Sequence, residues 1–175
     1  MHDNTCIIFD GMALVQEMAA NKERIKTCKD LSDAITRAVN YKSKGHVIAY
    51  VIFDDYSVPT SMKNVTRKRR TGDKSSGRGF KVDKTTPIRD FASFLASTAA
   101  MDSLTLFLAD QLVRGVKSNI VTVTRQGVLD NMQATQNIVR ITSTHEEADT
   151  KMILYAAEIR KLGIKLTSTH PTLMY

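Results

Sequence analysis

The chain has 175 residues with 42% hydrophobic content, enough to bury one core and most simply a single α/β domain over residues 1–175. It has no apolar run of membrane-spanning length, and residues 1–4 lack the basic start of a signal peptide. We therefore expect an intracellular protein, nuclear or cytoplasmic, that is neither secreted nor bound to a membrane. Cys6, in a predicted buried strand, and Cys28, in a predicted loop, are expected to be free thiols because they show no metal-ligand spacing.

The net charge of +7 lies in one segment. Residues 61–90 contain ten basic and three acidic side chains, whereas the rest of the chain is balanced at fifteen of each. Such a concentration is typical of a protein that binds a polyanion, most often nucleic acid. The middle of the segment is rich in Gly and Ser, which predicts a mobile loop, and the alternative is a solvated basic loop without a partner.

Two predicted strands end in aspartate. An apolar run at 6–9 stops at Asp10 and Gly11, and the strongest strand pattern, at 46–53, stops at Asp54 and Asp55. About thirty-five residues of helical pattern separate them, which predicts a right-handed crossover between parallel strands. Asp10 and Asp54 are then expected at the same edge of the sheet, although an aspartate after a strand is also a common helix cap.

Further elements are predicted along the chain. Helices are expected at 12–20, after Asp30 or Ser32, from Pro87, and after Asp102 or Ser103; strands are expected at 119–124, 138–141 and 164–167. This alternation predicts a three-layer α/β/α fold around a central, mostly parallel sheet.

Acidic residues crowd the start of one more predicted helix. Ser143 or Thr144 can provide the N-cap, and Glu146 or Glu147 can complete a capping box. Glu147 and Asp149 lie in the first turn, so their carboxylates can converge above the helix N-terminus and bind a divalent cation. The alternative is that acidic residues simply favour the positive end of the helix dipole. The apolar face of this helix is predicted to consist of Ala148, Met152, Ala156 and Ile159, and Gly163 is predicted to end it.

Three segments together resemble the PIN-like and flap-endonuclease superfamily of metal-dependent nucleases, and most closely a poorly characterised PIN-like family of animal proteins. They are the strand and Asp-Gly at 7–12, the strand and Asp at 51–54 followed by a basic stretch at 61–70, and the Glu-Ala-Asp at 147–149. Their order and spacing extend over nearly the whole chain.

The resemblance implies an acidic site at the carboxyl edge of a parallel sheet, binding Mg²⁺ or Mn²⁺ through oxygen ligands. It assigns the catalytic and metal-ligand roles to Asp10, Asp54, Glu147 and Asp149, with Glu146 and Asp55 as supporting or surface groups. It also implies a basic arch that holds nucleic-acid phosphates without reading bases. The arch residues would be Lys63, Arg67, Lys68, Arg69 and Arg70.

The C-terminal part departs from the superfamily pattern. Where the next strand should end in an Asp-x-Asp pair, this sequence has His170 and Thr172, and it stops at Tyr175 although the superfamily continues. We therefore expect a C-terminally truncated, degenerate domain, unless the register of the last eight residues is different. His170 is either a replacement ligand or a solvent-facing turn residue. The functional hypotheses are a Mg²⁺- or Mn²⁺-dependent endo- or exonuclease, or a catalytically inactive nucleic-acid-binding or structural module.

Overall fold

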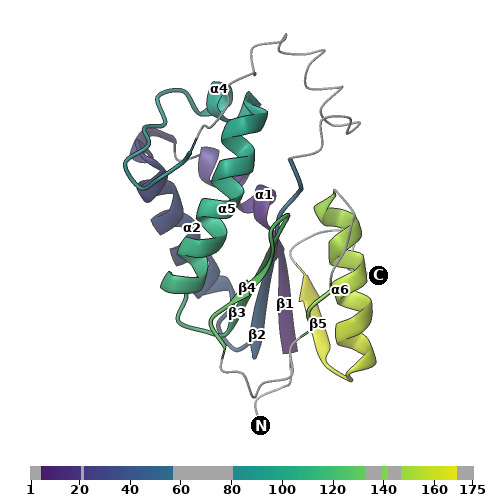
Figure 1. The fold of residues 1–175 in the computed structure, drawn as a ribbon. Coiled ribbons are helices and arrows are strands. Elements are labelled where there is room, and N and C mark those ends of the chain that lie inside the picture. Colours follow the sequence, from purple (N-terminus) through teal and green to yellow (C-terminus); the bar gives the residue numbers. More distant parts are fainter. Residues whose placement is uncertain (1–4, 21, 57–80, 133–138, 142–146, 169–175) are drawn as a thin grey trace.

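The computed structural model describes residues 5–20, 22–56, 81–132, 139–141 and 147–168. The elements are β1 (Thr5–Asp10), α1 (Gly11–Ala19), the short 3₁₀ helix η1 (Lys22–Arg24), α2 (Cys28–Lys42), β2 (Ile48–Ile52), α4 (Phe91–Ala96), α5 (Thr98–Gly115), β3 (Ile120–Thr124), β4 (Gly127–Asp130), α6 (Ala148–Lys161) and β5 (Lys165–Ser168). Figure 1 shows the sheet between two helical layers.

The sheet of the described residues has the strand order β4-β3-β2-β1-β5. The β2 strand lies at its centre and pairs in parallel with β1 on one side and β3 on the other, and β1 also pairs in parallel with the edge strand β5. Only β4, at the edge, is antiparallel, because it is joined to β3 by a tight hairpin. The predicted α/β fold with a mostly parallel sheet is confirmed.

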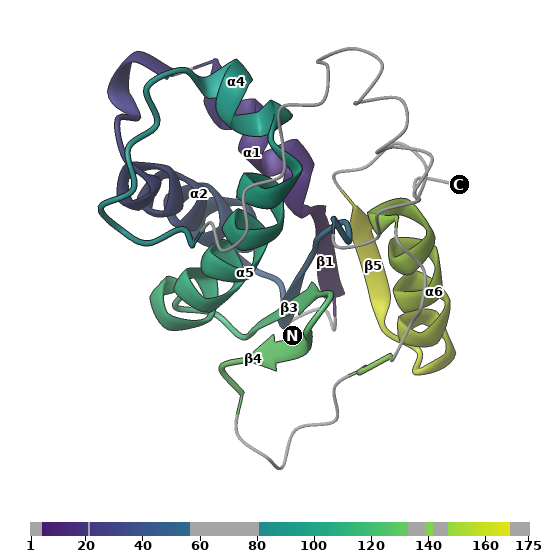
Figure 2. The ribbon, with the colours of Figure 1, turned by 45° about the horizontal axis from the view of Figure 1, so that its top comes forward.

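Each face of the sheet packs against its own apolar core. Alternate strand residues such as Ile7, Phe9 and Val51 point toward α1, α2 and α5, and the residues between them, such as Ile8 and Tyr50, point toward α6. Strands covered on both faces read as continuous apolar runs, and the runs at 6–9 and 46–53 showed this pattern in the sequence. Figure 2 shows α6 alone on its side, with the remaining helices opposite.

The apolar face predicted for the acidic helix is confirmed. Four side chains of α6, those of Ala148, Met152, Ala156 and Ile159, are buried. The helix ends at Lys161, and the predicted terminating residue Gly163 follows the C-cap Leu162 with a positive φ of 72°. The Gly163 N–H donates to the Arg160 carbonyl and the Ile164 N–H donates to the Ile159 carbonyl, a Schellman ending.

Several predicted helix starts were wrong because a better cap lay nearby. The α2 helix begins at Cys28, not after Asp30 or Ser32: Thr27 is the N-cap, and Asp30 completes a capping box with it. Cys28 is therefore a buried helical residue and not part of a loop, and both cysteines are free thiols.

Pro87 does not open a helix. It forms an isolated bridge with Thr27, and α4 begins after Asp90, whose carboxylate accepts the N–H of Ser93. The following helix, α5, begins after Ser97, so that Asp102 and Ser103 are interior helix residues and not caps.

The segment after β3 also differs from expectation. Residues predicted as irregular form the edge strand β4, whereas Val139 to Ile141, predicted as a strand, have no strand pairing. The backbone N–H groups of Val139 and Ile141 instead donate to the hydroxyls of Tyr50 and Tyr155. Two tyrosine hydroxyls on the α6 side of the sheet therefore bind this segment, and it makes no strand-to-strand hydrogen bonds of a β-ladder.

Some predictions concern residues outside the described ranges. These are the caps Ser143 and Thr144, Glu146, the arch residues Lys63, Arg67, Lys68, Arg69 and Arg70, and the C-terminal positions His170 and Thr172. Within the described ranges, no helix is both long and apolar enough to cross a membrane.

Candidate functional site at the carboxyl edge of the sheet

The carboxyl edge of the parallel strands brings together acidic residues that are far apart in the sequence. Asp10 is the last residue of β1 and pairs in register with Ile52, so Asp54 lies two residues beyond the same level on the neighbouring strand. Asp149, in the first turn of α6, is close enough that it and Asp54 both act on the charge of Asp10. The sequence analysis predicted that four carboxylates, those of Asp10, Asp54, Glu147 and Asp149, would converge at this edge.

Asp10 is half-buried and caps the helix that follows it. Its Oδ1 accepts the backbone N–H of Met12 at 2.8 Å and that of Ala13 at 3.1 Å. Burial raises the pKa of Asp10, and the nearby charges of Asp54 and Asp149 raise it further, against the lowering effect of the two backbone hydrogen bonds. The ionised carboxylate is therefore held in an environment that opposes its charge.

Gly11 makes this cap possible. A Cβ at Gly11 would lie 2.4 Å from ring atoms of Phe53, the residue just before Asp54. The ring packs where a side chain would otherwise be, so β1 can turn directly into α1 beside the end of β2. The Asp-Gly pair of the sequence thus has a packing reason as well as a capping one.

Asp54 caps a helix that is distant in sequence. Its Oδ1 accepts the Ala148 N–H, the first amide of α6, at 2.7 Å, and its Oδ2 accepts the Tyr56 hydroxyl at 3.2 Å. The residue in the N-cap position of α6, Glu147, makes no side-chain capping bond. The capping box predicted from the sequence does not start this helix, which begins at Ala148 and takes its cap from the end of β2.

The two acidic residues of the α6 start are more exposed than the strand-end pair. Glu147 and Asp149 are both solvent-exposed, although each has interactions with its surroundings. Of the four predicted ligands, Asp54 and Asp149 lie close enough to Asp10 to raise its pKa.

Lys151 is a further charged residue at this edge that the sequence analysis did not identify. Its side chain is 3% exposed, and its Nζ donates to the Phe53 carbonyl at 3.4 Å. Burial lowers the pKa of Lys151, and the carboxylates of Asp55 and Asp54 oppose this change. The sequence position could have indicated this burial. Lys151 comes three residues after Ala148 on the predicted apolar face of the helix, and a buried lysine needs a polar partner.

The carboxylates at this edge are donors of the type that suits a hard divalent cation. Within the described ranges, no three His, Cys, Asp or Glu side chains come close enough together to hold one metal ion. One carboxylate oxygen of Asp10 and one of Asp54 already accept hydrogen bonds from backbone amides. The Lys151 ammonium also supplies positive charge near Asp54. The described residues do not form a complete metal site by themselves, and we assign no chemical step to a cation.

No protein-family profile, curated protein or solved structure matches this chain. The PIN-like resemblance therefore remains a prediction from the sequence motifs.

Proposed function

We propose that the chain is a degenerate PIN-like domain of the metal-dependent nuclease type. It binds nucleic acid without sequence preference through the basic segment 61–90, and it hydrolyses phosphodiester bonds slowly with weakly bound Mg²⁺ or Mn²⁺. The observation that supports this proposal is that Asp10 ends β1 in register with Ile52 at the carboxyl edge of a parallel sheet, where the charges of Asp54 and Asp149 both raise its pKa. Ligands of open α/β sheets bind at this edge.

The chain's own residues contribute orientation and charge in this proposal. Asp54 fixes the start of α6 through the Ala148 amide, and this places Asp149 on the same edge as Asp10. A bound divalent cation would neutralise the developing charge on the scissile phosphate. The sequence lacks the Asp-x-Asp pair, and each ~1.4 kcal/mol of lost transition-state stabilisation slows cleavage about tenfold, so we expect low activity.

A second candidate function is a catalytically inactive module that binds nucleic acid. It is favoured by the hydrogen bonds of the strand-end carboxylates, since Asp10 caps α1 and Asp54 caps α6. In this case the acidic edge stabilises the fold, and the basic segment alone supplies the function.

Cleavage of end-labelled single-stranded and branched DNA and RNA, measured during Mg²⁺ and Mn²⁺ titrations, separates the two candidates. For the nuclease we expect slow, metal-dependent cleavage that is abolished by Asp54→Asn and unaffected by Asp110→Asn, a matched change on α5, away from the edge. Binding without cleavage at any metal concentration would support the inactive module. A chain that neither binds nor cleaves would contradict both.

The missing Asp pair can be tested directly. The double variant His170→Asp, Thr172→Asp restores the two carboxylates that the superfamily pattern requires at these positions. We expect faster metal-dependent cleavage than in the parent chain, lost again when Asp54→Asn is added. No gain of activity would contradict the proposal that the missing carboxylate pair limits cleavage by this chain.

Binding to nucleic acid has its own test. Replacing Arg67, Arg69 and Arg70 with alanine should weaken binding to all sequences alike and reduce the dependence of log K on log salt by about 0.7–0.9 for each lost phosphate contact. A salt dependence equal to that of the parent chain would contradict the assignment of this segment to phosphate binding. The matched control is the triple variant Lys29→Ala, Lys42→Ala, Arg114→Ala, which removes equal charge from α2 and α5.

A further inference from the structure

Lys151 is the only charged residue in the described part of the chain that is buried, with 3% of its surface exposed. Its Nζ donates to the Phe53 carbonyl at 3.4 Å, and no carboxylate oxygen of the described residues lies within ion-pair distance of it. One long hydrogen bond does not replace the hydration that a buried ammonium loses. The charge of Lys151 must therefore be stabilised by acidic groups somewhat farther away.

These acidic groups are the carboxylates at the end of β2. Asp55 and Asp54 are the residues whose charges favour the ammonium form of Lys151. Two hydrogen bonds explain why they lie nearby. The Lys151 Nζ is bound to the carbonyl of Phe53, the residue before Asp54, and Asp54 itself accepts the N–H of Ala148, three residues before Lys151 on α6. The same contacts that attach α6 to the sheet thus place the ammonium next to the strand end that carries Asp54.

The other cations around Lys151 have aspartate partners of their own. Lys151 lines a pocket of about 280 Å³ whose walls also contain Arg125 and Arg140. Arg125 forms an ion pair with Asp102, and Arg140 forms one with Asp130. Of the three cations of this pocket, Lys151 is therefore the one that has no carboxylate at ion-pair distance among the described residues and lies within reach of the charge of Asp54.

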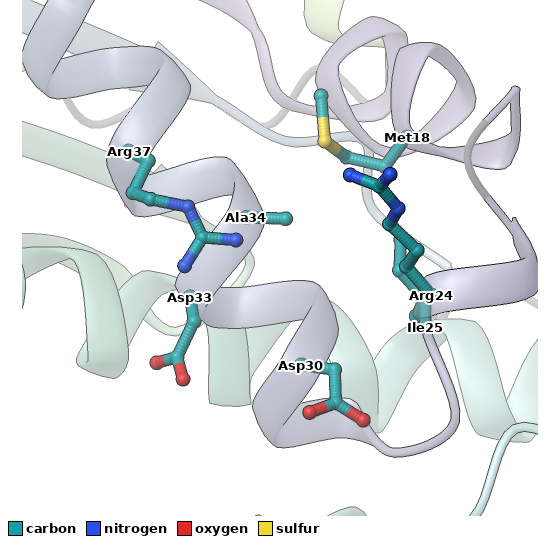
Figure 3. A pocket seen from close by; sticks show the side chains of 7 residues that line it. All are labelled: Met18, Arg24, Ile25, Asp30, Asp33, Ala34 and Arg37. Carbon is teal, nitrogen blue, oxygen red and sulfur yellow. The ribbon is translucent and has the colours of Figure 1, made fainter.

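Charged groups at the surface of the protein are arranged differently. Figure 3 shows Arg24 and Arg37 around a pocket whose walls also carry Asp30 and Asp33. Both arginines are exposed and both aspartates are partly exposed, so water and salt screen these charges and none of them needs a fixed counter-charge. Lys151 is shielded from water, and its charge acts on its neighbours with much less screening.

We propose that Lys151 is the resident cation of the acidic edge: its ammonium balances the charge of Asp54 that a divalent cation would otherwise balance, and it thereby weakens the binding of Mg²⁺ and Mn²⁺. A divalent cation and an ammonium group near the same carboxylate repel each other. The described carboxylates accordingly do not form a three-ligand metal site. The inference rests on the proposed function for the place at which a cation binds, but it concerns the affinity for the metal and not cleavage.

The test is titration of the full chain with Mn²⁺, followed by the paramagnetic broadening of backbone amide signals in NMR. Lys151→Met removes the charge and keeps an unbranched side chain of similar length, which suits the buried position. We expect Mn²⁺ to bind this variant at least about tenfold more tightly than the parent chain and to broaden the amides of Met12, Ala13 and Ala148 first. Equal affinities, or broadening confined to other parts of the chain, would overturn the proposal.

Two further variants separate charge from packing and from the hydrogen bond. Lys151→Gln removes the charge but keeps N–H donors, and it should strengthen Mn²⁺ binding as Lys151→Met does. Lys42→Met removes an equal charge from α2, where Lys42 is paired with Glu17, and it should leave the affinity for Mn²⁺ unchanged. A gain with Lys151→Met but not with Lys151→Gln, or an equal gain with Lys42→Met, would contradict the proposal.

Thermal unfolding shows whether each variant folds and gives a second measure of binding. Saturating Mn²⁺ should raise the Tm of Lys151→Met and Lys151→Gln by more than it raises the Tm of the parent chain. If Lys151→Met does not fold, the comparison of Lys151→Gln with the parent chain decides, and equal increases in Tm would overturn the proposal.

Metal binding and cleavage distinguish this inference from the nuclease proposal. Tighter Mn²⁺ binding by Lys151→Met, with no cleavage of nucleic acid by any variant or by the parent chain, would support the resident cation and contradict the nuclease. Metal-dependent cleavage by the parent chain, with the same Mn²⁺ affinity in all variants, would support the nuclease and contradict the resident cation.

Discussion

The backbone amides at the N-termini of α2 and α6 find their hydrogen-bond acceptors in different ways. Thr27 and Asp30, three residues apart, satisfy the first amides of α2 by a capping box made within the helix start itself. The first amide of α6 is instead satisfied by Asp54, which is 94 residues away along the chain. A local cap can stabilise its helix whether or not the helix is packed against the rest of the protein. A distant cap forms only when the helix is packed against the sheet.

Removal of the distant cap should have the largest effect. Asp54→Ala leaves the Ala148 amide and the Tyr56 hydroxyl without this acceptor and takes one counter-charge from buried Lys151. We expect a loss of about 3 kcal/mol in the free energy of unfolding, measured by urea denaturation. Asp54→Asn keeps an acceptor and should lose clearly less. Equal losses for both variants would mean that the negative charge, and not the hydrogen bond to α6, matters.

Disturbing the close approach of α1 to the end of β2 should have the second-largest effect on stability. Gly11→Ala places a methyl group 2.4 Å from the Phe53 ring, and we expect a loss of about 2 kcal/mol because the ring must move. In a Phe53→Leu background the same change should be less costly. The double-mutant cycle from urea unfolding measures this coupling. A fully additive pair would contradict the contact.

The local cap should have a smaller effect. Thr27→Ala removes the hydroxyl that accepts the Asp30 N–H at 3.2 Å, and we expect a loss of about 1 kcal/mol in the free energy of unfolding. Thr27→Ser keeps the hydroxyl and should be close to the parent chain. Hydrogen exchange should show faster opening of the first turn of α2 but not of α6. Faster exchange in both helices would mean that the two starts are coupled.

Replacing Asp10 should have the smallest effect on the free energy of unfolding, and this effect should depend most clearly on pH. Its pKa is raised in the folded protein, so the folded chain binds more protons than the unfolded chain between the ordinary aspartate pKa and the raised one. Stability from this group is present below the unfolded pKa and is lost as the pH rises through the folded pKa. Asp10→Asn retains a cap for α1 and should be slightly more stable than the parent above that window and equal to it below. Urea unfolding at pH 3 and pH 7 tests this, and a variant less stable than the parent at pH 7 would contradict it.

The sequence predicted the parts of the fold that depend on local pattern. Apolar runs at 6–9, 46–53 and 119–124 became β1, β2 and β3, and the apolar face of α6 is buried where the period of 3.6 placed it. Because parallel strands share one carboxyl edge, Asp10 and Asp54 could also be assigned to one region before the structure was known. The edge strand β4 was missed, because it is short and partly exposed and has no strong apolar pattern.

Only the tertiary structure decided what the charged groups contact. Ser143, Thr144 and Glu146 have suitable chemistry for a helix start, yet the structure begins α6 at Ala148 with a cap from Asp54, because packing α6 on the sheet places its first amide beside the end of β2. The same packing buries Lys151. Such pairings depend on distances in space between segments, and periodicity along the chain carries no information about them.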